Sequence, residues 1–141
     1  MKTIQLNCFV AFLVLLFSHS IFASGSHSNS HDKKKFPEIS RDDLMKNISS
    51  ESVVLVDANG TESYKKNHLP TAINLESSDL KDKLPKDKGA LIVAYCGSKR
   101  CSAWKKAANK AASLGYTNIK HYQGGLKDWK KSGLKFESVK N

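Results

Sequence analysis

Two short runs of apolar residues, the first of them rich in β-branched side chains, constrain the fold more than any other feature of this chain. Residues 53–57 (VVLVD) and 91–95 (LIVAY) show no alternation between apolar and polar side chains. Continuous runs of this length are typical of strands buried on both faces, as in a parallel sheet covered by helices. Residues 118–122 (NIKHY) are a weaker third candidate. The sequence therefore predicts an α/β fold with a central parallel sheet.

Segments with helical patterns lie between the predicted strands. Residues 102–114 carry apolar side chains at spacings of three and four, with lysines opposite, and Gly115 follows as a helix stop. Ser40 has the chemistry of an N-cap and predicts a helix over 41–47. Shorter helices are predicted at 61–66, 77–83 and 126–132. This alternation implies right-handed crossovers and helices on both faces of the sheet.

The first 23 residues have the layout of a secretory signal peptide. Lys2 precedes an apolar run over 8–16, and small residues lead to a cleavage site after Ala23. A membrane anchor is the alternative, but the run is shorter than the ~20 residues that a spanning helix needs. We therefore expect an exported protein, periplasmic or secreted, without membrane association after cleavage.

The remainder of the chain has the size of one domain. Residues 24–35 are polar and without periodicity, which predicts a disordered tail, and 36–141 form the predicted domain. The chain carries 23 Lys and Arg against 13 Asp and Glu, a net charge of +10. The lysines are scattered over several predicted helix faces, which indicates a solvated surface, although such a surface could also attract small anions or an acidic partner protein. Aromatic residues do not interleave with the basic ones, so we expect no nucleic-acid partner.

Two cysteines, Cys96 and Cys101, remain once Cys8 leaves with the leader. Export would place them in an oxidising compartment, where a pair can form a disulfide. A crosslink between residues five apart closes only a small loop, and the stabilisation from a crosslink grows with the size of the loop. The pair therefore indicates chemistry more than scaffolding.

The segment after the second predicted strand can hold an anionic sulfur. In an open parallel sheet, ligands bind at the carboxyl ends of the strands, where Cys96 stands. The loop amides and the start of the following helix offer a partial positive charge, and Lys99 and Arg100 add full charges. Gly97, without a Cβ, lets the backbone approach a ligand. These features favour the thiolate of Cys96, which is the nucleophilic form.

Four segments resemble the rhodanese family, in the family's order, over about residues 36–133. They are Val54–Asp57 (its first core strand ending in Asp), 68–74 (HLPTAIN, similar to its His-Ile-Pro-Gly-Ala-Ile-Asn), Tyr95-Cys96 (the start of its active-site loop) and Gly124-Gly125 with Trp129 (its Gly-Gly-x-x-x-Trp). The resemblance implies a single-domain rhodanese-like fold and sulfurtransferase activity. It implies no metal and no organic cofactor.

The resemblance also implies a mechanism and a set of site residues. Cys96 would be the catalytic nucleophile, which takes a sulfur atom from a small anionic donor such as thiosulfate and passes it from a persulfide to cyanide or a thiol. The substrate and the persulfide would be held by Gly97, Ser98, Lys99, Arg100, Cys101 and Ser102, with Asp57 in a supporting role.

The sequence departs from the family pattern at three places. Lys99 and Cys101 stand where the family often has Gly and Arg, and Asn59 stands where many members have the Arg of Asp-Val-Arg. Related phosphatases and arsenate reductases carry an Arg at the position of Ser102, so phosphoester chemistry is not expected.

Cys101 has two interpretations. As a resolving thiol it would attack a persulfide on Cys96, release sulfide and leave a disulfide. Otherwise it is a small residue at the start of the helix. Two alternatives to a sulfurtransferase therefore stay open: a persulfide carrier that docks on a partner protein, and a dithiol redox protein that uses Cys96 and Cys101.

Overall fold

A four-stranded parallel sheet lies at the centre of residues 36–140, the part of the chain that the computed structural model describes. The predicted signal peptide (1–23) and polar tail (24–35) lie outside the described residues. The strands are β1 (Val53–Asp57), β2 (Ile73–Asn74), β3 (Leu91–Tyr95) and β4 (Ile119–Tyr122), in the spatial order β2-β1-β3-β4. Val54 pairs with Ile92, and Ile92 pairs with Ile119, so the two apolar runs are neighbours at the centre of the sheet. The predicted parallel α/β fold is confirmed.

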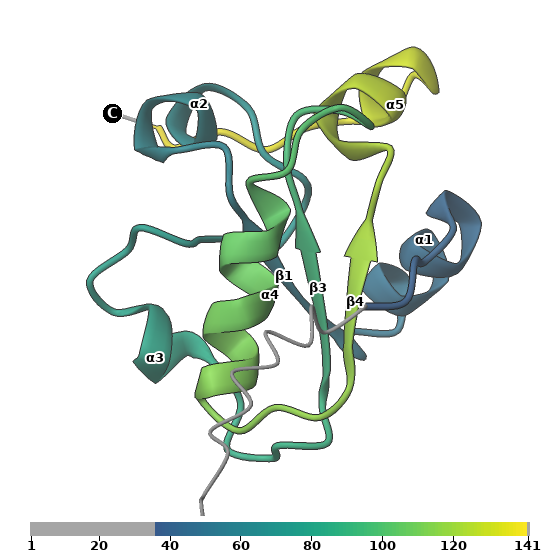
Figure 1. Ribbon diagram of the computed structural model, residues 1–141. Helices are drawn as coiled ribbons and strands as arrows, with labels where there is room; N and C mark the ends of the chain where they lie inside the picture. The colour runs from purple at the N-terminus through teal and green to yellow at the C-terminus, as the bar shows by residue number, and fades with distance from the viewer. Residues whose placement is uncertain (1–35, 141) are drawn as a thin grey trace, which may run out of the picture. The chain divides into compact units, whose positions relative to one another are not determined.

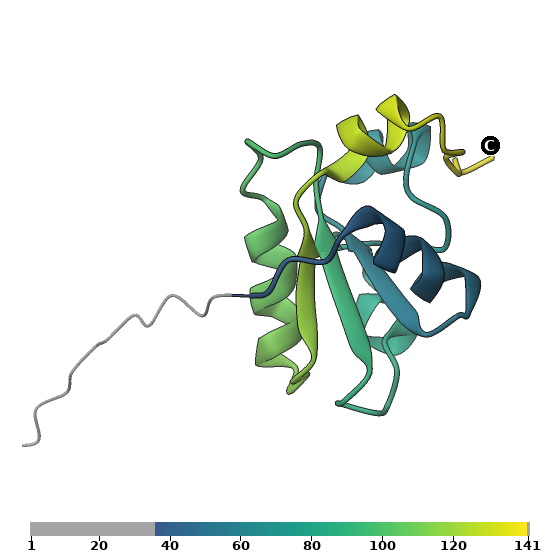
Figure 2. The same ribbon diagram turned by 90° about the vertical axis from the view of Figure 1, so that its right-hand side faces the viewer.

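Helices cover both faces of this sheet. They are α1 (Arg41–Ser49), α2 (Thr61–Lys66), α3 (Leu80–Lys83), α4 (Trp104–Ser113) and α5 (Gly125–Lys131). Side chains of α3 and α4 pack on one face, and those of α1, α2 and α5 pack on the other. Figure 1 shows α4 in front of the strands, and Figure 2 shows α1 and α4 on opposite sides of the sheet. In residues 36–140 no helix has the length and apolar character that crossing a bilayer requires.

The alternation of strand side chains explains why the two central runs are apolar throughout. Val56 and Ile92 point to the α4 side, where the alanines of that helix are small enough for close packing. Leu55, Val93 and Tyr95 point to the opposite side, against α1 and α5. Both faces of each strand are therefore removed from water, and a polar residue on either face would lie in a core.

Three elements differ most from the expectations. Helix α3 begins at Leu80 instead of residue 77, because residues 77–80 form a turn in which the Leu80 amide donates to the carbonyl of Ser77 (3.2 Å). Helix α4 begins at Trp104 instead of residue 102, because the amides of Lys105 and Lys106 donate to the carbonyls of Ser102 (3.0 Å) and Ala103 (2.9 Å). These bonds span three residues and form a tighter turn than the α-helix. Strand β2 was not predicted, because its two residues are too few to show a periodic pattern.

Candidate active site

The cysteine loop, residues 96–103, joins the carboxyl end of β3 to the start of α4. Figure 1 shows β3 and β4 pointing toward the end of the molecule where this loop and α5 lie. The amide of Leu126 donates to the carbonyl of Cys96 (3.1 Å), and the amide of Lys127 donates to that of Gly97 (2.9 Å). The first turn of α5 is therefore hydrogen-bonded to the loop at the residue that carries the predicted nucleophile.

Gly125 makes this close approach possible. Its φ is +59°, in the left-handed region, and a Cβ at this position would overlap the carbonyl oxygen of Cys96 and lie 2.9 Å from its carbonyl carbon. Both the backbone conformation and the space therefore require a residue without a side chain. The sequence motif contained Gly125, but its contact with Cys96 comes from the structure.

Cys96 and Cys101 are joined by a disulfide. Their Cα atoms lie 6.2 Å apart, within the range of roughly 4.4–6.8 Å that protein disulfides span. A turn in which the Cys101 amide donates to the carbonyl of Ser98 (2.9 Å) brings the two residues together. Cys96 is only 2% exposed, whereas Cys101 is half-buried. In this oxidised form Cys96 has no free thiolate, and Cys101 is the more accessible end of the bond.

Several successive amides of the loop have no backbone acceptor in the described part of the chain. Within residues 36–140, the amides of Gly97, Ser98, Lys99 and Arg100 donate to no backbone carbonyl. Helix α4 follows at once, and the side chain of its N-cap residue, Ala103, offers no hydrogen bond to the first turn. Successive free amides before an uncapped helix start form a partial positive charge that suits an anion. The exposed side chains of Lys99 and Arg100 add two full charges to it.

Asp57 is fully buried at the carboxyl end of β1, beside β3. One carboxylate oxygen accepts the hydroxyl of Tyr95 (2.6 Å), and the other accepts the backbone and side-chain amides of Asn59 (2.7 Å each). The Tyr95 oxygen accepts the amide of Leu69 (3.0 Å). Burial raises the pKa of Asp57, and the hydrogen bonds from Tyr95 and Asn59 act in the opposite direction. This network ties the ends of β1 and β3 together under the cysteine loop.

Asn59 lies between Asp57 and the cysteine loop. The side-chain oxygen of Asn59 lies 3.3 Å from the position that a Cβ on Gly97 would take. Asp57 fixes that side chain through the bond between its carboxylate and the Asn59 amide. The supporting residue predicted from the sequence therefore reaches the loop in two ways: through Tyr95, which precedes Cys96, and through Asn59, which was not predicted as a site residue.

Replacing Tyr95 by phenylalanine is expected to lower the free energy of unfolding by about 2 to 3 kcal/mol, because the Asp57 carboxylate and the Leu69 amide would both lose a buried partner. Urea titration measures the loss. The control is Tyr64→Phe, which removes one half-buried hydrogen bond to the carbonyl of Ala72 and should cost about 1 kcal/mol. Equal losses in the two variants would contradict the importance of the Asp57 network.

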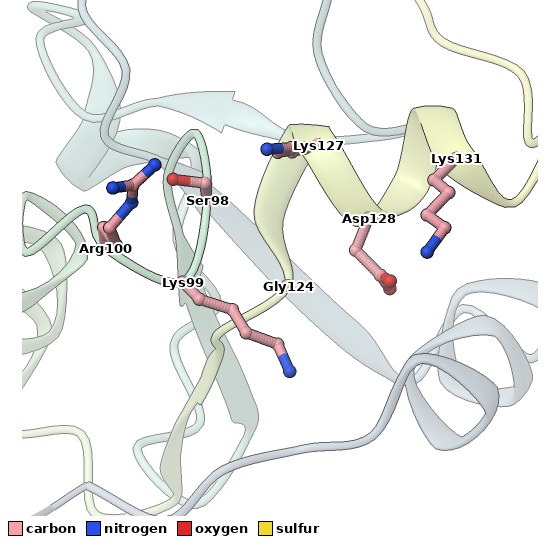
Figure 3. A pocket seen from close by; sticks show the side chains of 7 residues that line it. All are labelled: Ser98, Lys99, Arg100, Gly124, Lys127, Asp128 and Lys131. Carbon is pink, nitrogen blue, oxygen red and sulfur yellow. The ribbon is translucent and has the colours of Figure 1, made fainter.

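A pocket of about 310 Å³ opens between the cysteine loop and α5 (Figure 3). It is lined by Ser98, Lys99, Arg100, Gly124, Lys127, Asp128 and Lys131. The Asp128 carboxylate is already engaged, because it accepts the hydroxyl of Tyr122 (2.6 Å) and a guanidinium N–H of Arg41 (3.3 Å). Burial, and then the neighbouring Asp128, raise the pKa of Tyr122. Four cationic residues thus line the pocket together with one carboxylate that already has partners, and the pocket suits anions.

The structure separates the predicted site residues into two groups. Ser98, Lys99 and Arg100 line the pocket, whereas the others lie around the loop: Cys96, Gly97, Cys101, Ser102 and Asp57. Ser102 is exposed, and its carbonyl takes part in the turn that precedes α4. The pocket also includes Lys127 and Lys131, which the sequence indicates only by their spacing of four on a predicted helix.

Comparisons with known proteins agree with this geometry. Residues 40–132 match the family model of the rhodanese-like domain. The BH2092 protein from Bacillus halodurans has a solved structure that is 32% identical, with a TM-score of 0.64, covering 77% of this chain and 81% of that one.

Two curated proteins are similar to part of this chain. The HTH-type transcriptional regulator Rv0324 from Mycobacterium tuberculosis is 33% identical over 97 residues, 68% of this chain and 42% of that protein. The mouse thiosulfate sulfurtransferase/rhodanese-like domain-containing protein 3 is 28% identical over 95 residues, 58% of this chain and 60% of that protein. The chain thus spans about half the length of the curated relatives that it matches. With the family model matched from the first helix to the end of α5, and with a cysteine loop at the carboxyl end of the central strand, the chain belongs to the rhodanese-like domain family.

Proposed function

We propose that this chain is a sulfurtransferase that carries a persulfide on Cys96. The observation that supports it best is the position of Cys96 at the carboxyl end of the central strand, in a cationic loop in which the amides of residues 97–100 have no backbone acceptor among the described residues. A name that includes thiosulfate sulfurtransferase, borne by one curated relative, favours thiosulfate as the donor.

The proposed reaction has two displacement steps. The Cys96 thiolate attacks the outer sulfur of thiosulfate, the bond between the two sulfur atoms breaks, and sulfite leaves with the bonding electrons. The product is a Cys96 persulfide that carries one negative charge, for which the free amides of Gly97 to Arg100 are suitable donors. In the second step cyanide or a thiolate attacks the outer sulfur, and Cys96 leaves as a thiolate. Ping-pong kinetics follow from this scheme.

Intact-mass spectrometry tests the first step. After reduction and removal of the reductant, thiosulfate is expected to add the mass of one sulfur atom to the chain, because Cys96 is then free to attack. The oxidised chain should add nothing, since both cysteines are in the disulfide. Addition of cyanide should remove the extra mass and form thiocyanate. A reduced chain that takes up no sulfur would refute the proposal.

The disulfide favours a second candidate function, a thiol-linked persulfide reductase. The thiol of Cys101 would attack the inner sulfur of the Cys96 persulfide, and the outer sulfur would leave as hydrosulfide with the thiol proton. The product is the Cys96–Cys101 disulfide, the bond present in the structure. A dithiol reductant would then return both cysteines to thiols, and Cys101 is its more accessible point of attack. Release of sulfide from the persulfidated chain without any added acceptor separates this function from simple transfer.

We also propose that the chain acts outside the cytosol, in the periplasm or as a secreted protein. Two features support this location: the signal-peptide layout of residues 1–23 and a disulfide of a kind that persists in oxidising compartments. An acidic partner protein is a further proposed interaction, supported by the net charge of +10. Fractionation of the producing cells checks the location.

A further inference from the structure

We propose that the pocket between the cysteine loop and α5 binds the carboxylates of a small organic thiol, so that the acceptor of sulfur is a dicarboxylate thiol and Lys127 and Lys131 determine this specificity. The inference rests on the proposed function for the transfer step, but the binding site can be tested without it. Neither lysine belongs to the cysteine loop.

Two backbone hydrogen bonds hold α5, which forms one side of the pocket, against the cysteine loop. The amide of Lys127 donates to the carbonyl of Gly97, the residue next to the predicted nucleophile, and the amide of Leu126 donates to the carbonyl of Cys96 itself. A ligand held by α5 therefore lies beside the loop. In Figure 3, Lys127 extends from α5 toward the loop, and Lys99 extends from the loop toward α5. Both lysines line the pocket, one from each element.

The cationic side chains of the pocket have no ion-pair partner in the part of the chain that the structure describes. Lys99, Arg100, Lys127 and Lys131 take part in none of the ion pairs found in residues 36–140. Asp128, the one carboxylate in the lining, is bonded to Tyr122 and Arg41. Lys127 and Lys131 are four residues apart on one helix, so they lie on the same face and repel each other. A ligand with two carboxylates would relieve this repulsion at both lysines.

The size of the pocket favours an organic anion over the inorganic ones. Its volume of about 310 Å³ leaves room for a molecule larger than cyanide or thiosulfate. Cyanide has two heavy atoms and thiosulfate has five, whereas mercaptosuccinate, with two carboxylates and one thiol, has nine. Ser98 adds a hydroxyl group to the lining. A dicarboxylate thiol therefore fits both the volume and the charge.

The chemistry of the transfer is balanced without an oxidant. The thiolate of the acceptor attacks the outer sulfur of the Cys96 persulfide, the bond between the two persulfide sulfurs breaks, and Cys96 leaves as a thiolate. The acceptor becomes an organic persulfide, and the total charge is unchanged. Carboxylates held at α5 would bring the thiol next to the loop and turn a bimolecular step into an intramolecular one.

Transfer rates to three thiols test the specificity. The persulfidated chain is mixed with mercaptosuccinate, 3-mercaptopropionate or 2-mercaptoethanol, and rates are compared per thiolate. Mercaptosuccinate is expected to react at least tenfold faster than mercaptoethanol at low salt, with mercaptopropionate between them, and high salt should remove the preference. Lys127→Gln and Lys131→Gln should each reduce the preference several-fold. Lys130→Gln is the control to compare with Lys131→Gln, because Lys130 lies on the same helix and lines a neighbouring hollow that Lys131 does not touch, whereas Lys127 lines both. Equal rates for the three thiols, or an equal effect of Lys130→Gln, would overturn the proposal.

A binding experiment separates this inference from the proposed function. S-methyl mercaptosuccinate has both carboxylates but no free thiol, and it is titrated into the oxidised chain while amide shifts are followed by NMR. Shifts at Ser98, Gly124 and Lys127 that Lys131→Gln weakens would support the site, even if the chain transfers no sulfur. If the chain transfers sulfur but shows no such shifts, the proposed binding site is refuted and the proposed function stands. If a tetraglutamate peptide binds at least tenfold more tightly than S-methyl mercaptosuccinate, the pocket is a site for acidic peptides. The assignment to a small thiol is then overturned.

Discussion

Replacing Cys96 by serine is expected to lower the rate of sulfur transfer from thiosulfate to cyanide by at least about 10³-fold. A serine hydroxyl stays protonated at neutral pH and cannot form a persulfide, so both displacement steps lose their nucleophile. The rate is measured as thiocyanate formed per minute, with reductant present, and intact mass should show no added sulfur. Cys96 is 2% exposed and directly follows a central strand, and serine is nearly the same size, so the fold should persist. Turnover within tenfold of that of the natural chain would show that the nucleophile is a residue other than Cys96.

Cys101→Ser is the matched comparison, because it breaks the same disulfide and leaves the proposed nucleophile in place. This variant is expected to transfer sulfur with or without reductant, whereas the natural chain should be inactive until it is reduced. If Cys101 also resolves the persulfide, only the natural chain will release sulfide when no acceptor is present. An oxidised natural chain that is as active as the reduced one would show that the disulfide does not control the site.

The parts of the fold that were predicted from the sequence are those in which one local pattern decides the structure. The strands 53–57 and 91–95 were found at their observed bounds, because a strand covered on both faces needs an unbroken apolar run. Ser40 caps α1 as expected, with its hydroxyl accepting the amide of Asp43 (3.1 Å). Strand β2 escaped prediction because it is held by pairing with β1, a contact that no pattern within two residues can show.

The candidate site likewise has one part that a local sequence pattern predicts and one part that it does not. The cysteine loop was predictable, since its residues are contiguous and follow a strand of recognisable pattern. The cationic pocket was not, because it brings together Lys99 and Lys131, which helix α4 and strand β4 separate in the chain, and sequence spacing says nothing about the distance between them. The role of Asn59 depends on two contacts, with Asp57 and with Gly97, that only the packed sheet creates. Tertiary contacts of this kind leave no periodic signal.

Replacing Gly125 by alanine is expected to lower the free energy of unfolding by at least about 4 kcal/mol and to abolish sulfur transfer. The new Cβ would overlap the carbonyl oxygen of Cys96 and lie 3.0 Å from the carbonyl carbon of Gly97. These are backbone atoms of the cysteine loop, so no side chain can rotate to make room. Either α5 moves away, which breaks the bonds from Leu126 and Lys127, or the loop is displaced together with the predicted nucleophile. Urea titration and the thiocyanate assay measure the two losses.

Gly133→Ala separates the steric part of this effect from the conformational part. Gly133 also has a positive φ, +70°, but a Cβ there would meet nothing within 4 Å. Its replacement should therefore cost only the strain of a left-handed alanine, about 1 kcal/mol, and should leave transfer unchanged. The difference between the two losses of unfolding free energy measures the steric cost of placing a Cβ of α5 against the Cys96 carbonyl. If both variants lose the same stability, the backbone contact contributes nothing, and α5 would no longer be the element that holds the cysteine loop in place.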